Sequence, residues 1–159
     1  MSQIKILEGR LPLKRAARFG VIVSRFNSVI VENLQNACVA TLREQGVPDE
    51  DITVVKVPGA YEIPMAARRM AMNGDYDILI ALGAVIRGET PHFDYVAGEC
   101  ARGISEVSAD LDVPVIFGVL TTDTMQQAAD RAGGKAGNKG VEAMLTAIEM
   151  ANLLKAMPA

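Results

Sequence analysis

The amino-acid sequence predicts the α/β class: a three-layer αβα sandwich in which helices cover both faces of a parallel, flavodoxin-like sheet. Apolar runs of strand length recur along the chain, and stretches with the 3.6-residue period of an amphipathic helix separate them. The runs are continuous rather than alternating, which is typical of strands buried on both faces. Strands that alternate with helices imply right-handed crossovers and therefore a parallel sheet.

Four apolar runs are expected to form the sheet. They are "FGVIVSRF" at 19–26, "DITVVKV" at 51–57, "DILIALGAVI" at 77–86 and "VPVIFGVLTT" at 113–122. Ligands of open parallel sheets bind beyond the carboxyl ends of the strands. A functional site is therefore expected in the segments that end or follow these runs, namely "SRFN", "PGAYEIP", "GAVIRGETPH" and "TTDT".

Helices are expected between and after the runs. The first begins after the start signal at Asn27 and ends at Gly46, and the second begins near Pro64, which suits a first turn, and ends at Gly74. Further helices are expected at about 94–110, 124–132 and 138–157, with a glycine-rich turn "GGKAGNKG" before the last one.

The last expected helix is apolar around much of its circumference. One face of a sheet cannot cover so wide a surface, and in a small domain the second side is often covered by another subunit. The sequence therefore predicts a homo-oligomer. The apolar residues are Val141, Met144, Leu145, Ile148, Met150, Ala151, Leu153 and Leu154.

Length and composition exclude several classes of function. The chain has 159 residues, 50% of them hydrophobic, which suits a single domain over residues 1–159. A net charge of -3 without a basic run argues against nucleic-acid binding. No signal peptide and no span of roughly 20 apolar residues is visible, so a cytoplasmic protein without membrane contact is expected. Cys38 and Cys100 are expected to be buried thiols.

The segment "GAVIRGETPH" at 83–92 contains the G-x-x-x-x-G frame of a phosphate-binding P-loop. Glu89 and Thr90 stand where that motif requires Lys and then Ser or Thr, so nucleotide binding is not predicted. The only histidine, His92, ends the segment. An imidazole titrates near neutral pH and can transfer protons in both directions, although a solvated loop histidine is the alternative interpretation.

Metal and redox chemistry are not predicted. A single histidine without a cysteine cluster cannot provide the ligands of a catalytic zinc. Neither a G-x-S-x-G elbow nor a G-x-G-x-x-G dinucleotide fingerprint is present, so no cofactor is expected. Simpler roles remain open for the other polar and aromatic candidates: Phe26 could close the core, Glu62 could cap a helix, and Arg131 and Lys135 could be solvated surface charges.

Five segments in this order and spacing resemble the lumazine synthase family: "RFN", "VPGAYEIP", "LGAVIRGETPHFDYV", "PVIFGVLTT" and "RAGGKAGNKGVEA". The resemblance extends from Phe19 to Lys155. It implies a flavodoxin-like transferase of riboflavin biosynthesis. Members condense 5-amino-6-(D-ribitylamino)uracil with 3,4-dihydroxy-2-butanone 4-phosphate to 6,7-dimethyl-8-ribityllumazine, releasing phosphate and water without a cofactor.

The resemblance also implies roles for individual residues. His92 falls on the proposed proton donor and acceptor, and Phe26 on the ring that stacks on the pyrimidine. The remaining residues implied to bind the pyrimidine substrate are Ala60, Tyr61, Glu62, Ala84, Val85 and Ile86.

The same resemblance implies that the phosphate of the second substrate is bound by Glu89, Thr90, Arg131 and Lys135. A carboxylate beside a phosphate is repulsive, so Glu89 is expected to offer its N–H and turn its side chain away. Phe117 corresponds to an aromatic residue that reaches into the site of a neighbouring subunit.

The resemblance implies a homopentamer, and in some members a sixty-subunit shell of twelve pentamers that can enclose riboflavin synthase. The uninterrupted "GGKAGNKG" resembles shell-forming members. Two alternatives lack turnover: a flavodoxin-like protein that binds lumazine or flavin, and a shell-forming structural protein.

Overall fold

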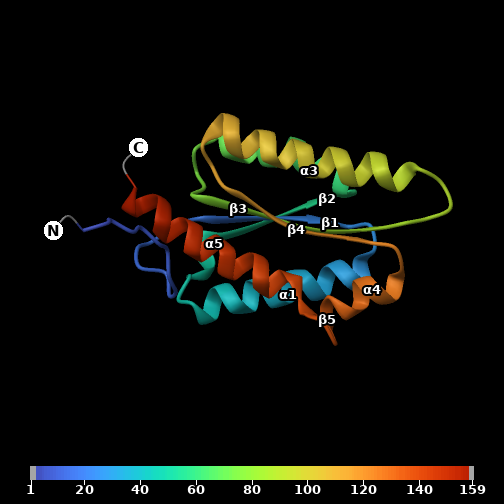
Figure 1. The fold of residues 1–159 in the computed structure, drawn as a ribbon, viewed down its shortest axis with the longest axis horizontal. Coiled ribbons are helices and arrows are strands. Elements are labelled where there is room, and N and C mark those ends of the chain that lie inside the picture. The colour runs from blue at the N-terminus through green and yellow to red at the C-terminus, as the bar shows by residue number, and fades with distance from the viewer. Residues whose placement is uncertain (1–2, 158–159) are drawn as a thin grey trace.

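The computed structural model describes residues 3–157 as a sheet covered by helices on both faces (Figure 1). Four parallel strands lie in the order β2-β1-β3-β4. They are β1 (Phe19–Ser24), β2 (Ile52–Val57), β3 (Ile78–Ile86) and β4 (Val115–Thr122). The predicted three-layer sandwich with a parallel sheet is confirmed. That residues 1–159 form a single domain stays a prediction.

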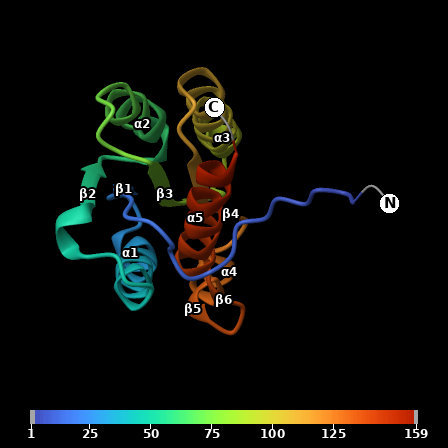
Figure 2. The same cartoon turned by 90° about the vertical axis from the view of Figure 1, so that its left-hand side faces the viewer.

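Helices from different parts of the chain cover the two faces (Figures 1 and 2). α2 (Ile63–Met72) and α3 (His92–Leu111) lie on one face of the sheet. The other face carries α1 (Ser28–Glu44), α4 (Met125–Asp130) and α5 (Lys139–Ala156). All five helices lie where the sequence predicted them, with ends that differ by about two residues, the usual scatter of helix boundaries.

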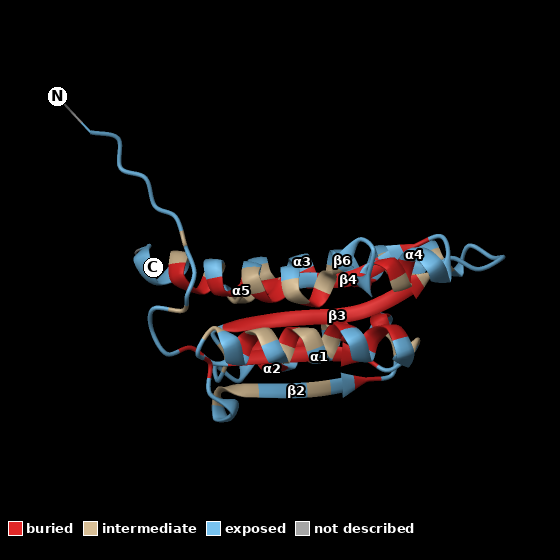
Figure 3. Ribbon diagram, turned by 90° about the horizontal axis from the view of Figure 1, so that it is seen from below, coloured by how far each residue is buried: buried red, intermediate tan, exposed pale blue. Residues whose placement is uncertain are grey.

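Two hydrophobic clusters share the central strand β3. Ile80 and Leu82 point into the cluster on the α1 and α5 face, whereas Leu79 and Ala81 point into the cluster on the α2 and α3 face. Because β3 pairs with strands on both sides and is covered on both faces, it is buried along nearly its whole length (Figure 3).

The prediction of burial on both faces was wrong for β2. This strand pairs only with β1 and forms an edge of the sheet, and Thr53, Val54 and Lys56 are exposed (Figure 3). Val57, at its carboxyl end, is the residue of the strand that is buried. An apolar run in the sequence identifies a strand, but the order of the strands in the sheet decides whether other strands and helices cover it.

The glycine-rich turn before α5 is a short antiparallel hairpin, which the sequence analysis did not predict. It consists of β5 (Ala132–Gly134) and β6 (Gly137–Asn138). Gly133 and Gly137 have φ values of 101° and 87°, a left-handed conformation that favours glycine. The hairpin carries Lys135 at its tip.

Close backbone contact holds α5 against α1. Asn138 caps α5 by accepting a hydrogen bond from the Gly140 N–H at 2.8 Å. A Cβ at Gly140 would collide with the carbonyl oxygen of Leu34, so the glycine permits this approach. The buried apolar residues of α5 are Ala143, Met144, Ala147, Ile148 and Ala151, and its half-buried ones are Val141, Leu145, Met150 and Leu153.

The N-terminal segment crosses α5 and covers part of its second side (Figure 2). Buried Asn152 holds this segment: its side chain accepts from the Lys14 N–H at 3.1 Å and donates to the carbonyl oxygens of Arg10 and Pro12 at 2.5 and 3.0 Å. Leu154 remains 36% exposed. The chain itself thus covers some of the surface for which another subunit was expected.

Both cysteines are buried, as predicted. Burial disfavours the thiolate and raises the pKa of Cys38 to about 12 and that of Cys100 to about 11. These thiols are therefore core residues of low reactivity. Over residues 3–157, none of the helices combines the length and the apolar character that crossing a membrane requires.

Candidate functional site

A cavity of about 640 Å³ opens where β1, β2 and β3 end and α3 begins. It lies beyond the carboxyl ends of the strands, where a parallel sheet is expected to bind its ligand. The sequence-predicted site residues that line it are Phe26, Ala60, Tyr61, Glu62, Ala84, Val85, Ile86, Thr90 and His92.

Phe26 forms part of the cavity wall. The Arg25 and Phe26 N–H groups donate to the carbonyl oxygens of Val57 and Pro58 at 2.8 and 3.1 Å, which extends the pairing of β1 beyond its last residue. Asn27 then turns the chain in a left-handed conformation and donates from its side chain to the Ala84 carbonyl at 3.0 Å. The Phe26 side chain is left 72% exposed, so the interpretation that it closes the core is wrong.

A single helical turn after β2 carries the second group of lining residues. The Glu62 N–H donates to the Gly59 carbonyl at 3.2 Å, which leaves Ala60 buried and Tyr61 exposed to 60%. Glu62 stands at the N-cap position of α2, but its carboxylate makes no capping hydrogen bond within residues 3–157. The capping interpretation is therefore not supported, and the carboxylate is available to a ligand.

His92 is the first residue of α3. It is exposed and lines the cavity, so its imidazole can contact a bound molecule. Its N–H lies 3.4 Å from the Thr90 hydroxyl oxygen. The first turn of a helix has N–H groups without intrahelical acceptors, which favours an anion at this end of α3.

Four predicted residues do not line the cavity in the single chain. Glu89 is exposed in the loop beside it. Phe117 lies in the edge strand β4, opposite Ala81, about 16 Å earlier along the sheet than Ile86 at the cavity. Its side chain is 37% exposed. An aromatic ring cannot span this distance, so Phe117 does not reach the cavity of its own chain.

The two predicted phosphate-binding cations also lie outside the cavity. Arg131 follows α4 and donates from Nη1 to the Gln127 carbonyl at 3.0 Å. Lys135 lies in the β5–β6 hairpin, with Nζ 3.7 Å from an Asp130 carboxylate oxygen. Both side chains are exposed. Within one chain they are surface charges, and the structure does not bring them together with His92.

The sequence analysis missed part of the cavity wall. Tyr95 and Val96 of α3 line the cavity beside His92. Positions three and four residues apart share one face of a helix, so the period of α3 counted from His92 could have identified both.

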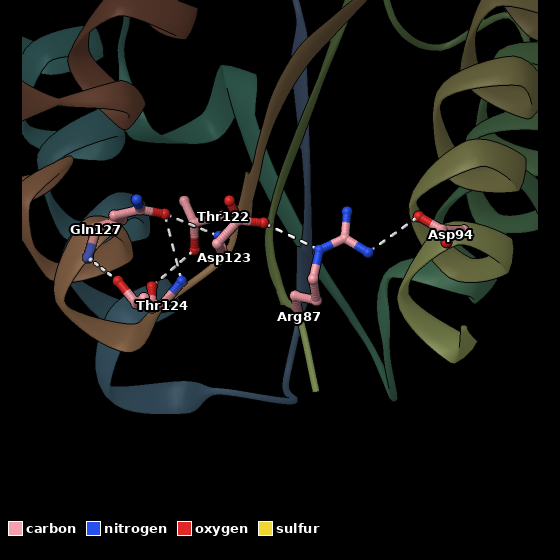
Figure 4. Close-up of polar contacts among 6 residues, drawn as sticks. All are labelled: Arg87, Asp94, Thr122, Asp123, Thr124 and Gln127. Atoms are coloured by element: carbon pink, nitrogen blue, oxygen red, sulfur yellow. Dashed lines mark hydrogen bonds and ion pairs between the residues drawn. The ribbon is translucent and has the colours of Figure 1, made fainter. Parts of the chain in front are cut away.

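Arg87, just beyond β3, was also missed. It lies between two carboxylates: Nε donates to Asp123 at 2.9 Å and Nη1 to Asp94 at 3.3 Å (Figure 4). These hydrogen bonds and the negative charges raise the pKa of the guanidinium, which therefore stays charged. Its carbon also lies 4.3 Å from the centre of the Phe93 ring.

The fold and the cavity define an α/β protein with a cavity of small-molecule size at the carboxyl edge of a parallel sheet. The family model described as 6,7-dimethyl-8-ribityllumazine synthase matches residues 16–155. The chain therefore belongs to the 6,7-dimethyl-8-ribityllumazine synthase family, a family of transferases in riboflavin biosynthesis whose members form oligomers and bind small-molecule substrates.

Proposed function

We propose that the protein condenses 5-amino-6-(D-ribitylamino)uracil with 3,4-dihydroxy-2-butanone 4-phosphate to 6,7-dimethyl-8-ribityllumazine. The cavity carries this proposal, because it combines an exposed aromatic ring, a free carboxylate and an imidazole. Phe26 stacks on the pyrimidine, and Glu62 accepts hydrogen bonds from the polar edge of the same substrate. His92 lies within the same cavity and transfers protons.

The proposed chemistry suits these side chains. The aromatic amine attacks the ketone and loses water to give an imine, phosphate is then eliminated, and ring closure loses a second water. Each step moves protons and none transfers electrons to an acceptor, so an imidazole near both substrates can serve throughout. The amine and the ketone are reactive already, and much of the acceleration comes from holding them together.

The phosphate site is proposed to be shared between subunits. Thr90 and the first turn of α3 hold one side of the phosphate. Arg131 and Lys135 of an adjacent subunit supply the positive charge, and Phe117 of that subunit closes the cavity. Support comes from the position of these three side chains, which are exposed on their own chain and outside its cavity.

We propose a homopentamer, because shared sites require a closed ring of subunits and the family resemblance implies a ring of five. We further propose that twelve pentamers form a sixty-subunit shell and that this shell encloses riboflavin synthase as a partner. We also propose a cytoplasmic location, where the charge of the phosphorylated substrate retains it. Light scattering measures the mass directly. A fully active species near the 17.0 kDa of one chain would refute shared sites, and one near five times that mass would support the pentamer but not the shell.

Mixing the two substrates with the protein tests the activity. Appearance of lumazine absorbance with release of inorganic phosphate is the expected result. A binding module without turnover would bind lumazine but leave the butanone phosphate intact, and a purely structural shell would do neither. Heat-denatured protein is the control, because an aromatic amine and a ketone can condense without a catalyst.

A further inference from the structure

Arg87 connects the first turn of α3 with the segment that follows β4, two parts of the molecule that lie far apart in the sequence. Its N–H donates to the Thr122 carbonyl at 2.9 Å, which extends the pairing of β3 and β4 by one residue. From this fixed backbone position the guanidinium reaches Asp94 in α3 and Asp123 after β4 (Figure 4). Neither Arg87 nor Asp123 lines the cavity, so any effect on catalysis must act through other residues.

On the α3 side, the guanidinium fixes the turn that begins at His92. Asp94 and Phe93 belong to this turn, and Arg87 contacts both: it donates to the carboxylate of the first and lies over the ring of the second. A helical turn moves as a unit, because its backbone hydrogen bonds fix the relation between its residues. A contact that holds this turn therefore also restricts where the backbone of His92 can lie.

On the other side, the contacts continue from Asp123 to Arg131. The Gln127 side chain accepts from the Asp123 N–H at 2.8 Å and from the Thr124 N–H at 3.3 Å, while the Thr124 hydroxyl accepts from the Gln127 N–H at 3.1 Å (Figure 4). This capping box defines the start of α4. The Gln127 carbonyl in turn accepts from Arg131 at 3.0 Å.

We propose that Arg87 is a positioning residue, which anchors the turn of His92 to the β4–α4 segment of the same chain. The Arg131 of that segment serves, under the proposed function, the site of an adjacent subunit. The planar guanidinium donates to two carboxylates from nitrogens in a rigid fork while it lies over a ring, whereas a lysine ammonium is a compact charge on a flexible stem and does not fix these three contacts in one geometry. The inference rests on the proposed function for its kinetic readout only. A misplacement of about 1 Å at a reacting group can cost up to a hundredfold in rate, so a contact outside the cavity can matter there.

Three variants test this role. Arg87→Met removes both the positive charge and the planar fork of donor nitrogens, whereas Arg87→Lys keeps the charge and loses only the fork. Arg43→Met is the matched control, since Arg43 also donates from two nitrogens to a carboxylate, that of Asp49, at 2.7 and 3.1 Å. That pair lies at the carboxyl end of α1, at the opposite edge of the sheet from the cavity.

The expected result is a kcat about tenfold or more lower in Arg87→Met, with only partial recovery in Arg87→Lys. Thermal unfolding and oligomer mass should stay as in the unsubstituted protein, because exposed ion pairs contribute little to stability. The control should keep full activity. Unchanged kcat in Arg87→Met would overturn the proposal. Full recovery in Arg87→Lys would also overturn it, because charge alone would then suffice.

A second readout needs no turnover. His92 is the only histidine, so its titration by NMR and its acylation by diethyl pyrocarbonate report on one imidazole. Both should change in Arg87→Lys, which conserves charge, and not in Arg43→Lys. No change would overturn positioning. Absence of lumazine formation by the unsubstituted protein would instead refute the proposed function and leave this readout intact.

Asp123→Asn tests the same contact from the side of the carboxylate, and as a single variant it leaves Arg87 in place. It removes one carboxylate from the guanidinium and should lower kcat in the same direction. The double variant Arg87→Met, Asp123→Asn should lose no more kcat than Arg87→Met alone, since both changes break the same contact between Arg87 and Asp123. Additive losses would show that the two residues act independently and would overturn the proposal.

Discussion

The predicted site has two parts, which one chain places differently: the pocket half, with Phe26, Glu62 and His92, and the β4–α4 half, with Phe117 and Arg131. Phe26, Glu62 and His92 line one cavity, because the segments that carry them follow parallel strands whose carboxyl ends meet at the same edge of the sheet. Phe117 and Arg131 lie on the surface away from that cavity. The difference supports the proposal that a single chain presents two half-sites rather than one complete site.

The largest expected effect tests the pocket half. His92→Ala should lower kcat while leaving the binding of both substrates nearly unchanged, since a general acid–base group acts in the transition state. Such groups contribute about 10² to 10⁴ in rate, and reactive substrates place this loss at or below the low end. Steady-state kinetics with both substrates measures it. Complete loss of activity in a normally folded variant would show that the imidazole does more than transfer protons.

The β4–α4 half should respond differently. Arg131→Ala removes the guanidinium that is proposed to pair with the phosphate from the start of binding, so KM for the butanone phosphate should rise about ten- to a hundredfold. The Kd of the pyrimidine substrate, measured by fluorescence or calorimetry, should not change. Equal weakening of both substrates would place Arg131 outside the phosphate site.

The sequence predicted most of the fold because the apolar periods that define strands and helices are local. It did not predict the exposure of β2, since "ITVVKV" has the same composition at an edge as in the middle of a sheet. It also missed the β5–β6 hairpin. Glycine adopts positive and negative φ values about equally, so the sequence "GGKAGNKG" does not show which of its glycines are left-handed.

The pocket half of the site could be predicted for a similar reason. Once parallel strands are assumed, the residues after each strand are known to meet. The contacts of Arg87 were not predicted, because Asp94 and Asp123 lie on different elements and only the packing of α3 beside the end of β4 brings them to one guanidinium. The roles assigned to the site residues stay predictions until variants are measured.

A complementation experiment tests whether the two halves belong to different subunits. His92→Ala subunits keep an intact Arg131, and Arg131→Ala subunits keep an intact His92. If neighbours share sites, oligomers reassembled from an equal mixture should contain intact sites at about a quarter of their interfaces. The activity of the mixed oligomers should then exceed that of either single variant when the butanone phosphate is below saturation. Activity equal to the mean of the parents would show that each site lies within one chain.

The smallest effect is expected at Glu89, which belongs to neither half. It is exposed in the loop between β3 and α3 and does not line the cavity, so its carboxylate can point into solvent. In that orientation only its backbone N–H is near a bound phosphate, and Ala provides the same N–H. Glu89→Ala should therefore change KM for the butanone phosphate by less than about twofold, since a solvated charge is strongly screened. Arg131→Ala, assayed in parallel, provides the scale. A marked fall in KM in Glu89→Ala would show that the carboxylate repels the phosphate, and a marked rise would show that the side chain itself contributes to binding.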